Sequence, residues 1–427
     1  MIYRHRLPLY LQPRLLVVLA LGFVSGLPLA LSASTLSIWL TESGVSLSAI
    51  GLFAAVGTPY TLKFLWSPLI DGLKLPLFTR LFGRRRGWLI ATQLLLIASL
   101  IALGFCNPSE NLLLMAIVAL LVAICSATQD IVIDAYRVEI LPTHEQGAGA
   151  AMVVLGYRLG MITSAAGALF LATAFGWQIT YMIMAAIVPI AWLAIAIGGE
   201  PESKACGLGL KAYGATDWIK KHVIEPFTDF MQRDAWLGIL LFILLYKLGD
   251  AFMGAMTNPF LINIGFTKNQ IATVVKLYGV IATIVGSLIS GVLVVRIGMM
   301  RTLWICGILQ TFTNLVFVAQ ARIGADEMFL AFSISLENIS GGMGTAAFVA
   351  FISSLVNKQF TATQYALLSS FSAFGRTWLS TPAGWFAGKL GWEAFFVLSV
   401  VLAIPGLVVL WWLSRRFRQS SISNQEP

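Results

Sequence analysis

Long apolar stretches, each of roughly 20 residues or more, alternate with short polar segments along the whole chain. Twelve can be delimited: 15–40, 48–70, 88–106, 111–140, 147–174, 177–197, 236–262, 270–295, 302–321, 327–356, 363–387 and 393–414. A helix of this length crosses the hydrocarbon core of a bilayer, and the alternation of a half-buried strand is absent. The pattern predicts an all-α polytopic membrane protein with 12 transmembrane helices.

Composition agrees with a chain that lies in lipid. Of 427 residues, 58% are hydrophobic and only 11% are charged, whereas about a quarter of a soluble domain is charged. The net charge of +9 could suggest nucleic-acid binding, but nineteen basic residues fall in loops on one side of the predicted membrane. The other side has only Lys268, Arg322 and Lys389. This asymmetry places both termini in the cytoplasm, so we expect a lipid bilayer as the partner and no nucleic acid.

The two halves of the chain resemble each other in order. Gly44 and Gly265 are related in this way, as are Gly83 and Gly298, and the pair "GW" opens the sixth stretch at 176–177 and the twelfth at 391–392. A parallel repeat of six helices predicts two pseudo-symmetric halves. We expect an N-terminal bundle over 1–197, a cytoplasmic linker over 198–235, and a C-terminal bundle with a short cytoplasmic tail over 236–427.

Charged residues inside the apolar stretches are the candidate chemistry, because each is costly in lipid and is kept only beside a partner or a wet cavity. They occur on the second, fourth, fifth, seventh, eighth, tenth and eleventh stretches. The set is Lys63, Asp130, Asp134, Arg137, Arg158, Lys247, Asp250, Lys276, Glu337 and Arg376. Apart from Arg137, five cations stand against Asp130, Asp250 and Glu337, which favours an anionic or zwitterionic solute.

Asp130 and Asp134 share a helical face, and Arg137 can pair with Asp134. Asp130 has no cation one turn away, so any partner would come from another helix, with Lys63 and Arg158 the nearest candidates by depth. We expect Asp130, Asp134 and Glu337 to be the protonatable sites. The alternative for both aspartates is a structural latch between helices, and Lys247 and Asp250 could simply neutralise each other.

Polar and aromatic side chains on the same stretches suit a sugar-containing solute. The predicted substrate-binding set is Lys63, Gln129, Tyr157, Arg158, Lys247, Asp250, Lys276, Asn338, Gln364 and Arg376. The three histidines are far apart, and the four cysteines show no ligand spacing. No metal or cofactor is expected, and the proton-motive force would drive transport.

Loop motifs and helix blocks resemble a known family. "GVLVVRIGMMR" (291–301), with Gly291, Arg296, Gly298 and Arg301, resembles the loop motif of the major facilitator superfamily. "DGLKLPLFTRLFGRRRG" (71–87), with Asp71, Gly83, Arg84, Arg85 and Arg86, is a stretched version expected to be structural. "LGFVSGLPLAL", "SATQDIVIDAYRVEIL", "GYRLGM", "YKLGDAF" and "GGMGTAAFVA" together resemble the AmpG family of muropeptide permeases, which is related to acetyl-CoA transporter-like carriers.

That resemblance implies a permease of the bacterial inner membrane, which we expect to be a monomer. It would import N-acetylglucosaminyl-1,6-anhydro-N-acetylmuramic acid, with or without its stem peptide, from periplasm to cytoplasm with protons, for peptidoglycan recycling. In bacteria with an inducible β-lactamase, such permeases also feed the induction signal.

Other functions remain open from the residues alone. A carrier of another large anion such as acetyl-CoA, or a sugar–proton symporter, would have similar charges. An intramembrane transferase is disfavoured, because no histidine lies within the apolar stretches, and we expect no enzymatic activity.

Overall fold

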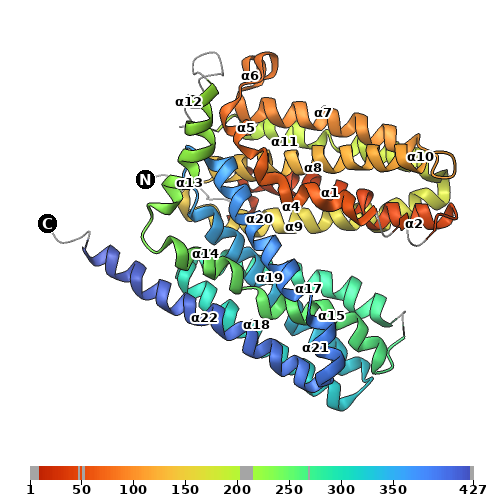
Figure 1. Cartoon of the computed structure of the whole chain (residues 1–427), viewed down its shortest axis with the longest axis vertical. Coiled ribbons are helices and arrows are strands. Elements are labelled where there is room, and N and C mark those ends of the chain that lie inside the picture. Colours follow the sequence, from red (N-terminus) through yellow and green to blue (C-terminus); the bar gives the residue numbers. More distant parts are fainter. Residues whose placement is uncertain (1–8, 47–48, 51–52, 202–214, 268–269, 424–427) are drawn as a thin grey trace, which may run out of the picture. The chain divides into compact units, whose positions relative to one another are not determined.

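The computed structural model describes residues 9–46, 49–50, 53–201, 215–267 and 270–423, and these contain helices and no β strand. The chain divides into two compact units (Figure 1). The first comprises Met1–Phe227 with Ser353–Ser370, and the second comprises Thr228–Ile352 with Phe371–Pro427. The segment 353–370, which we expected in the C-terminal bundle, is thus grouped with the first unit. Each unit is described by itself below.

The first unit contains long α-helices joined by short 3₁₀ and π segments. Its helices are α1 (Pro13–Ser32), α2 (Ser34–Glu42), α4 (Thr58–Leu62), α5 (Ser67–Gly72), α6 (Pro76–Phe82), α7 (Arg84–Gly104), α8 (Leu112–Ile140), α9 (Gln146–Ile162), α10 (Ala168–Ile187), α11 (Ile190–Gly198) and α12 (Ala215–Ile219). The 3₁₀ segments η1 (Leu9–Leu11), η2 (Phe53–Gly57), η3 (Lys63–Leu65) and η4 (Thr143–Glu145) and the π segments η5 (Thr163–Gly167) and η7 (Lys220–Ile224) connect them. Helix α13 (Glu225–Met231) follows at the boundary between the units.

The second unit begins with a broken helix and ends with a long one. Its elements are α14 (Trp236–Leu245), α15 (Leu248–Asn263), η8 (Ile271–Tyr278), α17 (Gly279–Ile297), α18 (Met299–Ile323), α19 (Glu327–Ser354), α20 (Thr361–Ser380), α21 (Ala383–Leu390) and α22 (Trp392–Ser423). The end of α19 from Ser353 and the part of α20 up to Ser370 are grouped with the first unit. Its core includes the buried rings of Phe252, Phe260 and Phe396. Helix α22 packs along α18 (Figure 1).

Eight helical stretches of the described chain are long and apolar enough to cross a membrane. One of them, Thr143–Gly198, holds the predicted fifth and sixth stretches, which meet at the non-helical Gly176 (φ 79°). The predicted second stretch is divided into short 3₁₀ and α segments. The tenth stretch corresponds to α19 and the eleventh to α20 and α21; both are helical, but neither is among the eight. These account for the difference from the 12 predicted spans.

Glycines bring α1 and α9 into backbone contact. A methyl group on Gly156 would overlap the carbonyl oxygen of Leu19, and one on Gly26 would overlap that of Tyr157. Helices approach this closely only where a residue lacks Cβ. Helices α1 and α9 therefore form one of the most tightly packed pairs in the first unit (Figure 1).

The predicted repeat is visible in the backbone. Gly44 and Gly265 both follow a helix with positive φ, at 75° and 107°, in the left-handed conformation that ends helices. Gly83 and Gly298 both precede a helix, at 90° and 87°. At the start of the sixth and twelfth stretches, Gly176 and Gly391 have φ of 79° and 74°.

The tryptophans that follow those last two glycines make equivalent contacts. Trp177 Nε1 donates to Glu42 Oε2 at 2.9 Å, and Trp392 Nε1 donates to Asn263 Oδ1 at 2.7 Å. Glu42 and Asn263 are the last residues of α2 and α15, the helices that complete the first and seventh stretches. The repeat therefore preserves side-chain contacts as well as turns.

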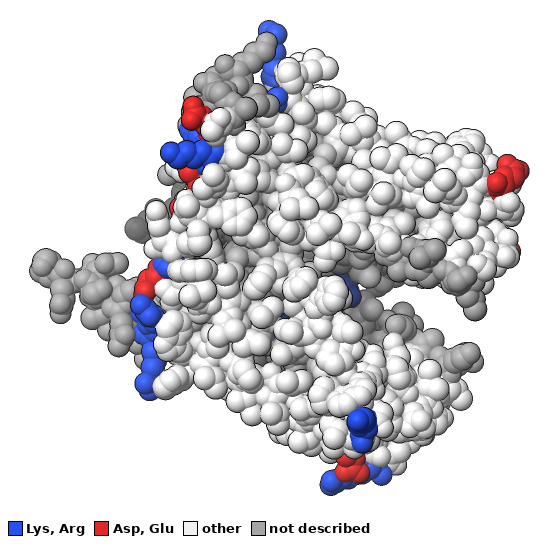
Figure 2. All heavy atoms as spheres, in the orientation of Figure 1, with Lys and Arg blue, Asp and Glu red and all other residues white. Residues whose placement is uncertain are grey.

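Charged side chains on the face in Figure 2 lie mostly near the ends of the helices, with uncharged surface between them. This is the distribution expected of helices whose middle parts contact lipid.

Candidate functional site

Asp130 lies in the second half of α8, whose N-cap residue Asn111 accepts a hydrogen bond at its side-chain oxygen from the amide of Leu114. Its Oδ1 accepts a hydrogen bond of 2.6 Å from the Ser25 hydroxyl on α1. No ion pair of Asp130 is present in the described part of the chain, and its side chain is partly exposed. Asp130 thus has a neutral hydrogen-bond partner, and the charge of Lys63, one of the two cations that we considered, acts on it from beyond ion-pair distance.

Lys63 contacts the neighbouring aspartate instead. Its Nζ lies 3.7 Å from Asp134 Oδ2, and Arg137 Nη2 lies 3.8 Å from Asp134 Oδ1. Arg137 is fully buried, donates to the Ser353 hydroxyl at 3.0 Å and stacks on the Tyr365 ring. Asp134 therefore joins two cations from η3 and α8, which fits the structural reading of the Asp134–Arg137 pair.

Gln129 is completely buried, and its Nε2 donates to the carbonyl oxygen of Val24 at 3.3 Å. That carbonyl would ordinarily accept from the amide four residues later, but residue 28 is proline and has no N–H. Gln129 therefore satisfies a backbone group that the proline leaves open. This position does not present its amide to a substrate.

Arg158 on α9 is the clearest candidate for contact with an anionic solute. Its side chain is partly buried, and no hydrogen bond or ion pair of that side chain is found among the described residues. A guanidinium in a membrane segment needs an anion, a dipole or water. Tyr157, its neighbour, is partly buried, and its backbone lies against Gly26.

The predicted loop motif of the first half is built around Asp71, at the end of α5 and only 3% exposed. Its Oδ1 contacts Arg85 Nη2 at 2.8 Å and Arg84 Nη2 at 3.3 Å. Its Oδ2 accepts from the amide and the hydroxyl of Thr363, each at 2.8 Å. Burial acts to raise the pKa of Asp71, but Arg85 and Arg84 outweigh burial and hold the pKa below its ordinary value.

Two further glutamates complete this network, and the sequence reasoning missed both. Glu139, at the end of α8, accepts from Arg85 Nε at 3.0 Å. Glu200 Oε1 accepts from the Arg85 amide at 2.7 Å, and its Oε2 accepts from the Arg86 amide at 3.0 Å. A carboxylate at the first turn of a helix satisfies orphan N–H groups and complements the helix dipole. The signal for them in the sequence is their position: Glu139 lies at the end of the fourth apolar stretch, and Glu200 lies just after the end of the sixth.

In the second unit, Lys247 lies at the break between α14 and α15 and is 5% exposed. Its Nζ donates to Asp250 Oδ2 at 2.9 Å, to Gln310 Oε1 at 3.4 Å and to the Gly341 carbonyl at 3.3 Å. The ammonium therefore links the helix break to α18 and α19. This agrees with mutual neutralisation of Lys247 and Asp250 and leaves Lys247 little surface for a substrate.

Glu337 and Asn338 lie on α19, and both are partly buried. Asn338 Nδ2 donates to Glu337 Oε2 at 2.6 Å, and Asn338 Oδ1 accepts from the Thr283 hydroxyl on α17 at 2.8 Å. The amide thus positions the carboxylate that we expected to be protonatable.

The remaining predicted site residues are placed differently from one another. Gln364 is buried, and its amide binds the backbone at Asn357 and Pro226. Arg376 on α20 is exposed, and the side chain of Lys276 lies outside the described part of the structure. In the second loop motif Gly291 is buried, whereas Arg296 and Arg301 are exposed.

Comparison with known proteins agrees with this arrangement. Residues 18–375 match the Major Facilitator Superfamily. The chain is 45% identical over 407 residues to the anhydromuropeptide permease of Escherichia coli K12, covering 95% of this chain and 80% of that protein. It is 38% identical over 405 residues to the putative transporter AmpG 4 of Rickettsia conorii, covering 94% and 97%.

Solved structures agree in fold. The proton:xylose symporter XylE has a TM-score of 0.70 at 12% identity, covering 93% of this chain and 94% of that one. The human organic anion transporter MFSD10 has a TM-score of 0.63 at 14% identity, covering 93% and 97%. The chain belongs to the major facilitator superfamily and, within it, to the AmpG family of permeases.

Proposed function

We propose that this protein imports anhydromuropeptides across the bacterial inner membrane, coupled to protons, with both termini in the cytoplasm. The observation that carries the substrate is the 45% identity to an anhydromuropeptide permease over 95% of the chain. The charges support it, because Arg158 is a partly buried cation whose side chain has no partner in the described residues. The saccharide and peptide would cross the membrane without chemical change.

Proton coupling is proposed for Asp130 on geometric grounds. A carboxylate in a low-dielectric site is costly when charged, and the cost is removed by a cation or by protonation. Asp134 has Lys63 and Arg137 within 4 Å, whereas Asp130 has the hydroxyl of Ser25. Of the two aspartates on α8, Asp130 is therefore the one that can exchange a proton without breaking an ion pair.

The test is uptake of radiolabelled N-acetylglucosaminyl-1,6-anhydro-N-acetylmuramic acid into proteoliposomes, with and without an inward proton gradient. We expect the gradient to drive accumulation by the wild type. Asp130→Asn is expected to exchange substrate across the membrane and fail to concentrate it. The matched control is Asp229→Asn, since Asp229 is partly exposed and pairs with Arg233 one turn away.

Each result bears on a different part of the proposal. Absence of wild-type uptake would refute the substrate. Uptake that ignores the gradient would refute proton coupling. Normal accumulation by Asp130→Asn would move the coupling role to another carboxylate, and Glu337→Gln would be measured next.

A further inference from the structure

The first turns of α7 and α18 are equivalent in the repeat, yet among the described residues a carboxylate closes the first turn and none closes the second. Gly83 and Gly298 begin these turns with nearly the same positive φ. Glu200 packs directly against Gly83 and accepts from the amides of Arg85 and Arg86. Around Gly298, a Cβ would meet no atom within 4 Å.

The sequence explains why the second turn is open. Gly83 and Gly298 lie 215 residues apart, as do Trp177 and Trp392. The same offset places Arg415 where the first half has Glu200, and an offset one residue longer places Arg416 there. In either alignment a cation replaces the anion that caps the helix.

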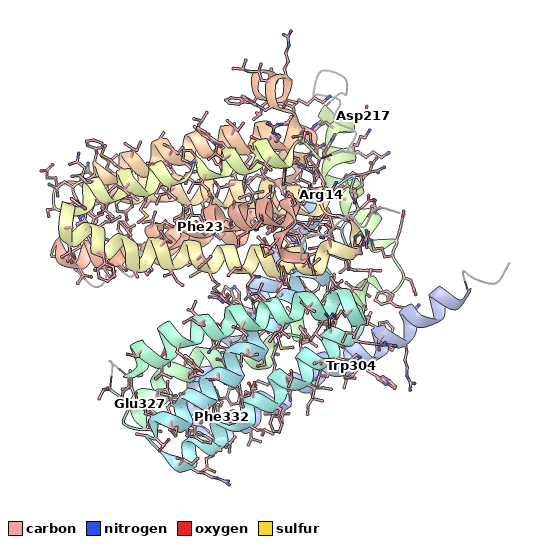
Figure 3. All side chains as sticks on the ribbon, turned by 180° about the vertical axis from the view of Figure 1, so that it is seen from behind. Arg14, Phe23, Asp217, Trp304, Glu327 and Phe332 are labelled. Atoms are coloured by element: carbon pink, nitrogen blue, oxygen red, sulfur yellow. The ribbon has the colours of Figure 1, made fainter. Side chains whose placement is uncertain are left out.

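A pocket of about 410 Å³ lies at this open turn, within the second unit. It is lined at one side by the first turn of α18 and at the other by α22: Ile297, Gly298, Met299, Met300, Arg301, Trp304, Ser414 and Phe417. Figure 3 shows Trp304 on α18, near the end of that helix that lies away from Glu327. The backbone N–H groups in the first turn of α18 have no acceptor within the helix, so the side of the pocket that they line is electropositive.

The arginines around the pocket differ in whether their side chains already have a partner in the protein. The Arg301 side chain is exposed and has no hydrogen bond or ion pair among the residues that the structure covers. Arg416 pairs with Asp234 at 2.6 Å, and the Arg415 guanidinium lies 3.9 Å from the centre of the Trp411 ring. An anion in the pocket would complete the coordination of Arg301 in particular.

Each exposed arginine ends a stripe of exposed apolar side chains at helical spacing. Ile305, Ile308 and Phe312 follow Arg301 on one face of α18, and they are 38%, 53% and 60% exposed. Val408 and Trp411 precede Arg415 on α22, and they are 57% and 46% exposed. A ligand with a phosphate and long hydrocarbon chains matches a cationic pocket at the end of such stripes.

We propose that the pocket between the first turn of α18 and the end of α22 binds the headgroup of an anionic phospholipid. Its phosphate takes the place that the Glu200 carboxylate has in the first half, accepting from the amides of Met300 and Arg301 and pairing with the Arg301 guanidinium. The acyl chains lie along the apolar stripes. The first half needs no such ligand, because its own carboxylate fills the turn.

The test is native mass spectrometry of the full-length protein in detergent, titrated with phosphatidylglycerol or with phosphatidylcholine of the same chains. We expect phosphatidylglycerol to bind about five-fold more tightly, the contribution of one arginine near a membrane surface. Arg301→Gln is expected to abolish that preference. The matched control is Arg322→Gln, since Arg322 ends the same helix and pairs with Glu393 on the exposed surface.

A second variant restores the arrangement of the first half. Arg415→Glu places a carboxylate at the position of Glu200, and we expect it to lower phosphatidylglycerol binding about five-fold or more while the protein stays folded. Equal binding of the two lipids, unchanged binding in Arg301→Gln, or an equal loss in Arg322→Gln would overturn the proposal. Glycerol phosphate is the competitor for the final arm. If it displaced the lipid at equal concentration, the ligand would be a small soluble anion and the lipid assignment would be wrong.

Discussion

Replacing Asp71 with asparagine isolates the buried charge network of the first unit. The wild-type carboxylate pairs with Arg85 and Arg84 and accepts the amide and hydroxyl of Thr363. In Asp71→Asn, Arg85 keeps Glu139, but Arg84 loses its only carboxylate within 4 Å in the described residues. Arg84 is 7% exposed, so its charge would be left without a partner in a buried site.

Removing one member of a buried ion pair costs about 3–5 kcal/mol, because the other charge stays desolvated. We expect the lower end, about 3 kcal/mol, since asparagine keeps an oxygen for Thr363 and Glu139 still neutralises Arg85. For a unit of this size the loss lowers the unfolding midpoint by about 6–12 °C.

The assay is thermal unfolding of the purified protein in one detergent, followed by tryptophan fluorescence. Glu393→Gln is the control, because it also removes a carboxylate from an arginine pair, here with side chains 50% and 71% exposed. An exposed pair contributes about 0–1 kcal/mol, so its midpoint should move by no more than about 4 °C. Equal shifts in the two variants would refute the reasoning, because they would mean that burial does not set the value of the Asp71 pairs.

Three further outcomes follow from the first unit. Gly156→Ala should lower the unfolding free energy by about 1–3 kcal/mol in the same thermal assay, because the methyl group meets the α1 backbone. Gly167→Ala is the control and should be neutral, because the nearest atom to its methyl group is 3.9 Å away. Glu200→Gln should cost about 1 kcal/mol through the α7 cap, measured by thermal unfolding at low and high salt, and an effect that salt leaves unchanged would contradict the dipole contribution. Because the folded pKa of Asp71 lies below its ordinary value, its stabilisation should be present above about pH 4 and be lost as the pH falls through the lowered pKa; Asp71→Asn should lack that acid loss in a series of midpoints against pH.

Much of the fold could be predicted from apolar length and repeat pattern, because both are local properties of the sequence. The paired glycines show why. Gly83 and Gly298 take positive φ that few other residues tolerate, so the turn and the residue type predict each other. The split of the second stretch into 3₁₀ and α segments was not predicted, although Gly57, Pro59 and Pro68 within it are residues that interrupt helices.

The partners of the buried charges were the least predictable part. Lys63 was one of two cations considered for Asp130 by depth, but it begins the 3₁₀ segment η3 and its ion pair is with Asp134. A 3₁₀ turn winds more tightly and rises further per residue, so it changes both the direction and the depth of a side chain. The contact of Asp71 with Thr363 joins residues 292 positions apart, and no local pattern reveals such a pair.

The two halves keep the same turns and differ in what those turns hold. At the first, Arg84 and Arg85 are buried and matched by Asp71 and Glu139, and Glu200 covers the glycine. At the second, the equivalents of the two buried arginines are Met299 and Met300, and no carboxylate caps the turn in the part of the chain that the structure describes. The positive φ of the turn requires glycine in both halves, whereas the residues that surround the turn are under no such backbone constraint and differ between the halves. At the first turn, the charges are therefore neutralised by other side chains of the protein, which stabilises the fold. At the second turn, the N-terminal end of α18 is left to be neutralised by a bound anion. Substitutions in the first network should change stability in any detergent, while those around Arg301 should matter only when an anionic lipid is present.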